Sequence, residues 1–365
     1  MIALEALALI AGAVLIWIVV SSAIRTVIVP RGEVVIVTRA VFLAVRKVFT
    51  IFAREAHTYE RRDRVMARYA PTALMLLPIV WAVGVLVGFA AIYWAIDGSG
   101  WSVFLLSGSS LTTLGFERAD HDGVMLISVL EALIGLGLIA LLISFLPTIY
   151  GHFSRRETLV SKLYIRAQDA DGEARPVSLI VRSHRIGGLE RMGELWPEWE
   201  QWFVEVGEAH TSFPALVFFR SPSPRRSWIT ASGMALDSAA IMLATVNTTY
   251  DPHAAIMIRS GYEALRDIAD YYGIPYNADP APDDPITVTR DEFITVYERL
   301  AESGVPVRPD REAAWRAYRG WRVNYDEVLV KLAALTMAPF APWVSDRSVA
   351  YQRPPLRGVR RTHIR

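Results

Sequence analysis

Three long apolar runs dominate the first 150 residues of this 365-residue chain. They cover residues 6–24, 72–96 and 124–150, and Glu131 is the one charged side chain within them. A helix rises about 1.5 Å per residue, so about 20 apolar residues cross a hydrocarbon core roughly 30 Å thick. The runs therefore predict three membrane spans. A cleaved signal peptide is the alternative for the first run, but its start lacks the positive charges of such a peptide.

The charges that flank these runs predict their orientation. Residues 25–68 contain ten basic and four acidic side chains, whereas residues 97–123 contain one basic and four acidic ones. Basic loops remain on the cytoplasmic side of a membrane. We therefore expect the N-terminus outside and the C-terminus in the cytoplasm, with residues 1–28 as an N-terminal membrane helix.

Residues 29–71 form a basic linker that contains an amphipathic stretch at 34–53. Arg39 and Arg46 are seven residues apart and share one helical face. Such a helix either lies at the inner interface near anionic head groups or packs under the bundle, and the two arrangements are compatible.

Composition excludes several classes of function. The formal net charge is +1, which argues against a nucleic-acid partner because such proteins carry a basic excess. The chain has no cysteine, so thiol catalysis and cysteine-ligated metals are excluded. No metal-ligand spacing of histidines and no nucleophile elbow is present, so we expect a protein that is not an enzyme and holds no cofactor.

The segment between the second and third runs is the most unusual part of the chain. Residues 101–117 are too short and too polar to cross the membrane again, yet their first part is apolar. A stretch that enters the membrane and returns must be buried in protein or face a water-filled cavity. Residues 103–112 predict a short helix, and Gly115 after it permits backbone angles that other residues resist.

The sequence of this segment, Ser110-Leu111-Thr112-Thr113-Leu114-Gly115-Phe116, resembles the pore-loop signature of the potassium-channel superfamily. The resemblance covers residues 72–153, with an outer helix at 72–97, a pore helix and filter at 101–117, and an inner helix at 123–150. In that family, backbone carbonyls from four copies of the loop replace the hydration shell of the ion.

The resemblance implies a selectivity filter of Thr113, Leu114, Gly115 and Phe116, with K⁺ held by their carbonyls and the Thr113 hydroxyl adding an inner ring. One loop cannot surround an ion, so it also implies a homotetramer in the lipid bilayer, here the plasma membrane of a bacterium. The passing ion is K⁺, and Na⁺ as well if selectivity is relaxed.

The chain departs from the family pattern after Phe116. Glu117 stands at the second filter glycine and Arg118 at the following aspartate. A glutamate adopts the backbone geometry of that glycine only at a cost. Four copies of Glu117, extended by Asp120 and Asp122, would form a charged outer mouth that concentrates cations. The alternative is that Glu117 pairs with Arg118 at a solvated rim.

The third run has the features of an inner helix. Gly137 lies where related channels have a hinge glycine, and Gly135 competes with it for this role. Gly137, Leu141, Ser144 and Thr148 share one helical stripe that suits a water-filled pore. Alternatively, the two hydroxyls bond back to their own helix.

Glu131 lies about 120° around the helix from the inner-helix stripe. It should brace the filter from behind, bonded to Ser109 or Ser110. The alternative is a proton-sensitive gate, since carboxyls inside membranes are candidates for function.

Residues 154–365 predict a mostly α-helical cytoplasmic domain. Its pattern lacks the glycine-rich turn of a nucleotide site, so its ligand or partner is unknown. We expect three helices at 227–246 (buried core rather than a fourth span), 255–272 and 289–303, the last opened by a capping box between Thr289 and Glu292. A long helix should run from Asp310 to Ala338, and short strands should lie at 177–182 and 215–220. We also expect a core stripe of Trp196, Trp199 and Trp202 and a basic tail at 353–365.

The predicted fold is thus an all-α membrane protein with a span–pore helix–filter–span unit, one extra N-terminal span and a helical cytoplasmic domain. The predicted function is a homotetrameric, potassium-permeable cation channel. The alternative is a non-conducting receptor derived from a channel, whose cytoplasmic domain carries the activity.

Overall fold

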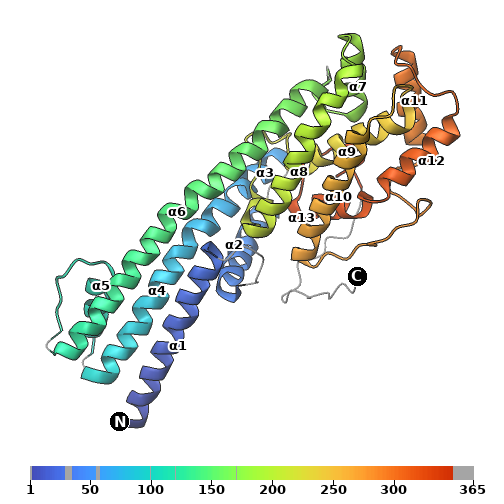
Figure 1. Cartoon of the computed structure of the whole chain (residues 1–365). Helices are drawn as coiled ribbons and strands as arrows, with labels where there is room; N and C mark the ends of the chain where they lie inside the picture. The colour runs from blue at the N-terminus through green and yellow to red at the C-terminus, as the bar shows by residue number, and fades with distance from the viewer. Residues whose placement is uncertain are drawn as a thin grey trace. The chain divides into compact units, whose positions relative to one another are not determined.

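The computed structural model of the chain describes residues 2–28, 35–54, 58–98, 100–119, 121–169 and 171–347 (Figure 1). Every regular element in these ranges is a helix, and the only strand-like pairing there is two isolated bridges. The all-α prediction is confirmed. The chain divides into two compact units, Met1–Gly151 and His152–Arg365, called the first and the second unit below.

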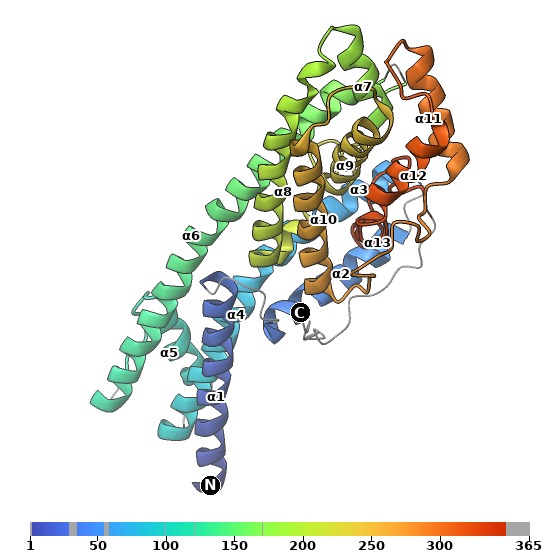
Figure 2. The same ribbon diagram turned by 45° about the vertical axis from the view of Figure 1, so that its right-hand side comes forward.

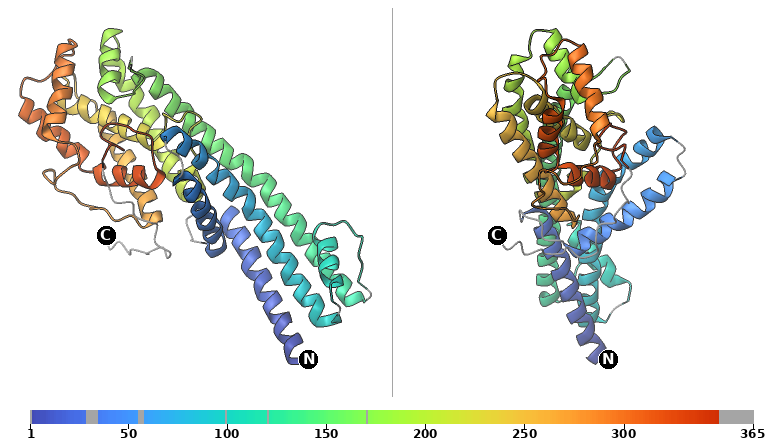
Figure 3. Two further views of the ribbon diagram at one scale, coloured as in Figure 1. Left: turned by 180° about the vertical axis from the view of Figure 1, so that it is seen from behind. Right: turned by 90° about the vertical axis from the view of Figure 1, so that its right-hand side faces the viewer.

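The first unit is built from long apolar helices. Its helices are α1 (Ile2–Val27), α2 (Ile36–Arg54), α3 (Tyr59–Ala67), α4 (Tyr69–Asp97), α5 (Ser102–Leu111) and the first part of α6 (Asp122–Ala167). Helices α1 and α4 run side by side (Figure 3), and the short α5 lies next to α4 (Figure 2). The three predicted spans are present as α1, α4 and α6, each longer than its apolar run.

Small residues allow α1 and α4 to approach closely. A Cβ atom added to Gly12 would lie 2.5 Å from the Gly88 carbonyl oxygen, so these two backbones touch. The buried indole of Trp81 also donates to the Ser22 hydroxyl at 3.2 Å. Membrane helices associate through such small-residue contacts and interhelical hydrogen bonds.

Helix α2 is the amphipathic helix that the linker predicts. It packs on α3 and α4 and buries Val41 and Val45. The Tyr69 hydroxyl of α4 donates to the Phe42 carbonyl oxygen at 3.3 Å. Packing against the bundle is therefore confirmed, and contact with lipid head groups stays a prediction.

The second unit is a helical bundle around α9. Its remaining elements are α7 (Pro176–Arg185), the 3₁₀ helix η1 (Glu190–Glu194), α8 (Leu195–Ser212), the 3₁₀ helix η2 (Pro214–Phe218), α9 (Trp228–Thr245), α10 (Pro252–Tyr272), α11 (Arg290–Glu302), α12 (Arg311–Arg322) and α13 (Asp326–Thr336). Helix α9 packs against α7, α10, α12 and α13, and α8 packs on α10.

Four helical stretches in the described ranges are long and apolar enough to cross a membrane: α1, Tyr59–Asp97, α6 and α9. The apolar window of α9 is 94% buried, so α9 is a core helix, as predicted. The tryptophan stripe of α8 is also confirmed as core, because Trp196, Trp199 and Trp202 are all buried. The predicted capping box between Thr289 and Glu292 opens α11.

Both strand predictions for this unit are wrong. Residues 177–182 are helical, in α7, and residues 215–218 are helical, in η2, while 219–220 belong to no strand; each of the two helices begins at a proline. A short apolar run cannot distinguish a strand from a buried helix, and proline favours the first position of a helix.

The long helix predicted from Asp310 onward is interrupted. It breaks into α12 and α13 around Asn324, whose side-chain amide donates to the carbonyl oxygens of Gly320 and Trp321 at 3.0 and 3.2 Å. An asparagine that bonds to nearby backbone competes with the helix.

The end of α6 is anchored in the second unit by a buried arginine. Arg156 donates to the carbonyl oxygens of Leu216 and Phe219, each at 2.8 Å, and to Glu157 at 2.9 Å. Its guanidinium also lies 3.0 Å from Nε2 of His210. Burial and the charge of Arg156 hold the pKa of His210 well below its usual value, so the imidazole is neutral and accepts this hydrogen bond.

Candidate functional site

Helix α5 reaches the middle of the long helices beside it. The Ser107 hydroxyl lies 3.0 Å from the Leu86 carbonyl oxygen, about 16 Å along α4 from the end of that helix. At its last turn, α5 meets α6, where a Cβ atom added to Gly135 would lie 2.2 Å from the Leu111 carbonyl oxygen. If α4 and α6 span a membrane, the end of α5 lies near the centre of the hydrocarbon core.

The chain leaves α5 through a left-handed cap. Thr113 has φ +57° and Gly115 has φ +71°, whereas Thr112 has φ −85°. The Thr113 N–H donates to the Ser110 carbonyl and the Leu114 N–H donates to the Ser109 carbonyl, both at 3.0 Å. This pattern is the Schellman motif, in which glycine usually takes the left-handed position. Thr113 takes it here, a conformation that a β-branched residue rarely adopts.

These hydrogen bonds decide where the carbonyl groups point. A trans peptide group is planar, and its N–H and C=O point in opposite directions. The N–H groups of Thr113 and Leu114 face α5, and that of Gly115 lies 3.5 Å from the Ser109 carbonyl oxygen. The carbonyl groups of the same peptides, those of Thr112, Thr113 and Leu114, therefore point away from α5.

Ser109 holds the far end of the loop in the same way. The Glu117 N–H donates to the Ser109 hydroxyl at 3.0 Å, and this hydroxyl lies 3.2 Å from the Glu117 carbonyl oxygen. The carbonyl of Phe116 shares a peptide group with the Glu117 N–H, so it also points away from α5. The side chains of Leu114 and Phe116 are 71% and 59% exposed, which leaves this face of the loop uncovered within one chain.

Three predicted filter carbonyls, those of Thr113, Leu114 and Phe116, therefore point away from α5, while no hydrogen bond among the described residues orients that of Gly115. The Thr113 hydroxyl donates to the Thr112 carbonyl at 2.7 Å. Glu117 does not occupy the left-handed region, so within one chain it does not adopt the backbone geometry that would be costly for a glutamate. The strained residue is Thr113, four positions earlier.

The outer-mouth residues are only partly described. Glu117 and Arg118 form no ion pair with each other or with any other described residue. The alternative in which Glu117 pairs with Arg118 is therefore absent from the described part of a single chain. Asp122 is exposed in the first turn of α6, and Asp120 lies outside the described residues.

Glu131 is fully buried between three helices. One carboxyl oxygen lies 2.8 Å from the Tyr93 hydroxyl of α4, and the other lies 2.5 Å from the Ser107 hydroxyl of α5. The predicted partners, Ser109 and Ser110, are wrong, because Ser107 is the residue whose position on α5 faces α6 at this level. The carboxyl thus joins α4, α5 and α6 behind the cap.

The hydrogen-bond donors and acceptors around Glu131 can be matched one to one. The Ser107 hydroxyl carries one proton but has two acceptors in reach, Glu131 and the Leu86 carbonyl oxygen. If Glu131 is a neutral acid that donates to Ser107, then Ser107 donates to Leu86 and Tyr93 donates to Glu131, and every group is satisfied.

A conservative pair of substitutions tests this count. We expect Glu131→Gln to retain thermal stability in detergent, because an amide also donates to Ser107 and accepts from Tyr93. Glu131→Leu should lose about 2 kcal/mol or more, since it leaves two buried hydroxyls without their acceptor or donor. Equal unfolding temperatures for the two variants would contradict the brace.

The inner-helix stripe lies on an open side of α6. Gly137, Ser144 and Thr148 are exposed and Leu141 is half-buried in the single chain. The Ser144 hydroxyl donates to the Leu141 carbonyl at 3.1 Å and Thr148 donates to the Ser144 carbonyl at 2.9 Å. The alternative of bonding back to the helix is confirmed, and lining of a pore stays a prediction.

The sequence did not reveal that Gly135 and Gly137 of α6 have different surroundings. Among the described residues, no atom lies within 4 Å of a Cβ atom added to Gly137, whereas a Cβ atom added to Gly135 overlaps the end of α5. Their spacing in the sequence could have indicated this difference, because residues two positions apart face different sides of a helix.

No family model, curated protein or solved structure matches the chain. No group of three or more His, Asp or Glu side chains within the described ranges is arranged to hold a metal ion. This observation does not concern ions held by backbone carbonyls.

Proposed function

We propose that four copies of this chain form a cation channel, in which ions pass between the loops that follow α5. The observation that carries the proposal is the hydrogen bonding of residues 113–117. It turns the N–H groups of the loop toward α5 and leaves several carbonyls facing away from it, near the middle of two membrane-length helices. Carbonyl oxygens are the groups that replace water around K⁺.

The arrangement of α6 is in keeping with an oligomer. Within one chain this helix has a narrow contact with α5 and α4, and much of its apolar surface is open. The exposed side chains include Leu126, Leu133 and Ile143, each at least 60% exposed. Lipid and neighbouring copies of the chain would cover this surface. A tetrameric mass of the detergent-extracted protein is expected, and a monomer would contradict the proposal.

Flux through proteoliposomes tests the proposed filter. We expect passive K⁺ flux for the unmodified protein and its loss by about tenfold or more in Gly115→Ala, because alanine disfavours a left-handed filter backbone. Gly98→Ala is a matched control. Gly98 is also left-handed (φ +61°) with open space around it, but it caps α4 outside the loop. Flux that survives in both variants would contradict the proposed filter, whereas no flux in the unmodified protein would contradict the channel and favour the receptor.

Glu117 is the position proposed to relax selectivity. Replacement by glycine should lower the permeability of Na⁺ relative to K⁺, because it permits the filter backbone to extend by one carbonyl. Glu117→Gln removes the charge but keeps the side chain, so it should reduce total cation flux at low salt while leaving the ratio unchanged. An unchanged Na⁺:K⁺ ratio in Glu117→Gly would rule out this role.

A further inference from the structure

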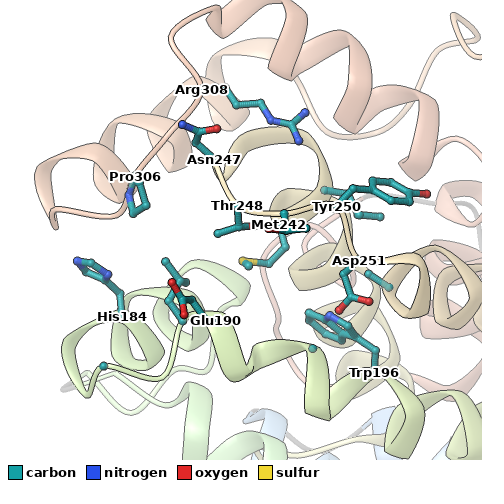
Figure 4. A pocket seen from close by; sticks show the side chains of 16 residues that line it. His184, Glu190, Trp196, Met242, Asn247, Thr248, Tyr250, Asp251, Pro306 and Arg308 are labelled. Carbon is teal, nitrogen blue, oxygen red and sulfur yellow. The ribbon is translucent and has the colours of Figure 1, made fainter.

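The second unit contains a cavity of about 890 Å³ that the channel proposal does not use. It lies between the end of α7 and η1 on one side and the chain that connects α9 to α10 on the other, next to the segment before α12 (Figure 4). Cavities of 300–1,000 Å³ are the size in which proteins bind small molecules. Its floor includes the buried side chains of Trp196, Leu243 and Ala254, so part of the lining is apolar.

One wall of the cavity carries a cation that the backbone holds in place. The Asn247 N–H donates to the Pro306 carbonyl and the Arg308 N–H donates to the Thr245 carbonyl, both at 2.8 Å. Val246 and Val307 pair between them as an isolated bridge. Because side chains alternate along extended chain, Asn247 and Arg308 lie on the opposite face from the two valines. Figure 4 shows both side chains at the same edge of the cavity.

Carboxylates occupy another side of the cavity. Glu190 begins η1, and Asp251 caps α10 through a hydrogen bond from the His253 N–H to Oδ1 at 3.0 Å. A Cβ atom added to Gly193 would lie 2.6 Å from Asp251 Oδ2, so η1 packs closely on this cap. The N-terminus of α10 offsets the charge of Asp251, which leaves Glu190 as the uncompensated negative charge.

Opposite charges therefore face one space without pairing. The side chains of Arg308, Glu190 and Asn247 form no hydrogen bond or ion pair with any described residue. Figure 4 shows Arg308 and Glu190 on different sides of the cavity. A ligand that complements this arrangement carries an anion at one end, a cation at the other and an apolar group for the floor.

We propose that this cavity binds a zwitterionic apolar amino acid or dipeptide, with its carboxylate at Arg308 and Asn247 and its ammonium group at Glu190. Arginine binds a carboxylate through two parallel hydrogen bonds, and the asparagine amide supplies a further donor. A nucleotide fits less well, because a phosphate would bring two negative charges into a cavity with one free cation and two carboxylates among its described residues. Binding here does not depend on ion conduction.

Calorimetric titration of the full-length protein in detergent tests the proposal. The probes are L-leucine, L-methionine, L-phenylalanine and the dipeptide L-leucyl-L-phenylalanine. At least one should bind with a Kd of about 1 mM or tighter. Phenethylamine and 3-phenylpropionate each lack one of the two charges of phenylalanine, so both should bind about tenfold or more weakly than phenylalanine if that probe binds.

Two single substitutions locate the binding. Arg308→Gln and Glu190→Gln should each weaken the zwitterion by about tenfold or more, and both side chains are accessible enough that neither change should unfold the unit. Arg259→Gln is the matched control, since Arg259 is an exposed arginine of α10 outside the cavity. The proposal is overturned if none of the four probes binds, or if both cavity variants bind as the unmodified protein does. Because the readout is heat of binding, its failure is distinct from a failure of ion flux.

Discussion

Replacing Arg322 with methionine should destabilise the second unit by about 3–5 kcal/mol, because it leaves buried carboxylates without their partner. Arg322 has no exposed surface, and it donates to both oxygens of Asp237 at 2.7 and 2.6 Å and to Asp326 at 2.7 Å. Burial alone would lower the pKa of this guanidinium, but the carboxylates of Asp237 and Asp326 raise it well above its usual value. The arginine therefore stays charged.

The surrounding groups explain why the loss should be so large. The hydroxyls of Tyr318 and Tyr325 donate to Asp237 at 3.1 and 2.9 Å, so this carboxylate belongs to a network that links α9, α12 and α13. Arg322 also donates to the Trp343 carbonyl oxygen at 2.5 Å. Removal of one member of a buried network leaves the others unsatisfied.

Thermal unfolding of the full-length protein gives the measurement. For a unit of this size, the expected loss corresponds to a fall in Tm of roughly 10 °C. Arg316→Met is the matched control, since Arg316 is an exposed arginine of α12, and it should change Tm little. The double variant Asp237→Asn with Arg322→Met should be less destabilised than the sum of its single variants. Strict additivity would show that the pair is not coupled.

Much of the secondary structure follows from local pattern. The length of the apolar runs predicts the spans, and a short apolar run that ends at Thr112 predicts α5. The capping box at Thr289 predicts the start of α11. Each of these signals lies within one segment and needs no partner. The break between α12 and α13 at Asn324 also has a local cause. An asparagine within an amphipathic pattern breaks a helix only when its amide bonds back to the preceding turn, and the sequence does not show whether it does.

The contacts between segments could not be predicted in the same way. Helical periodicity places Glu131 on a face of α6, but the identity of Ser107 as its partner depends on how far α5 descends beside that helix. The left-handed angle of Thr113 depends likewise on the carbonyls at the end of α5. The cavity of the second unit could be predicted even less, because Glu190, Asn247 and Arg308 come from three distant parts of the chain and only the fold brings them together.

Replacing Gly135 with alanine should disrupt the first unit far more than the same change at Gly137. A Cβ atom on Gly135 would lie 2.2 Å from the oxygen and 3.1 Å from the carbonyl carbon of Leu111. These are backbone atoms, and they cannot yield by a change of rotamer. Either α5 or α6 must move, at a cost of about 1–3 kcal/mol typical of overpacking.

Movement of Leu111 has a second consequence, because the left-handed cap begins two residues later. The carbonyls proposed to bind ions are positioned from Ser109 and Ser110, within the same turn of α5. A shift of about 1 Å there would misplace them, and ion selectivity depends on that geometry. We therefore expect Gly135→Ala to lower both Tm in detergent and K⁺ flux in proteoliposomes.

Gly137→Ala is the matched control, since its added methyl group meets no atom of the described ranges within 4 Å and alanine favours the helix by about 1 kcal/mol relative to glycine. Its Tm should equal or exceed that of the unmodified protein. A change of open probability without a change of Tm would mark Gly137 as the hinge, whereas Gly135→Ala should change both. If Gly135→Ala retains the Tm and flux of the unmodified protein, then α6 does not support the end of α5, and the proposed path for ions loses its scaffold.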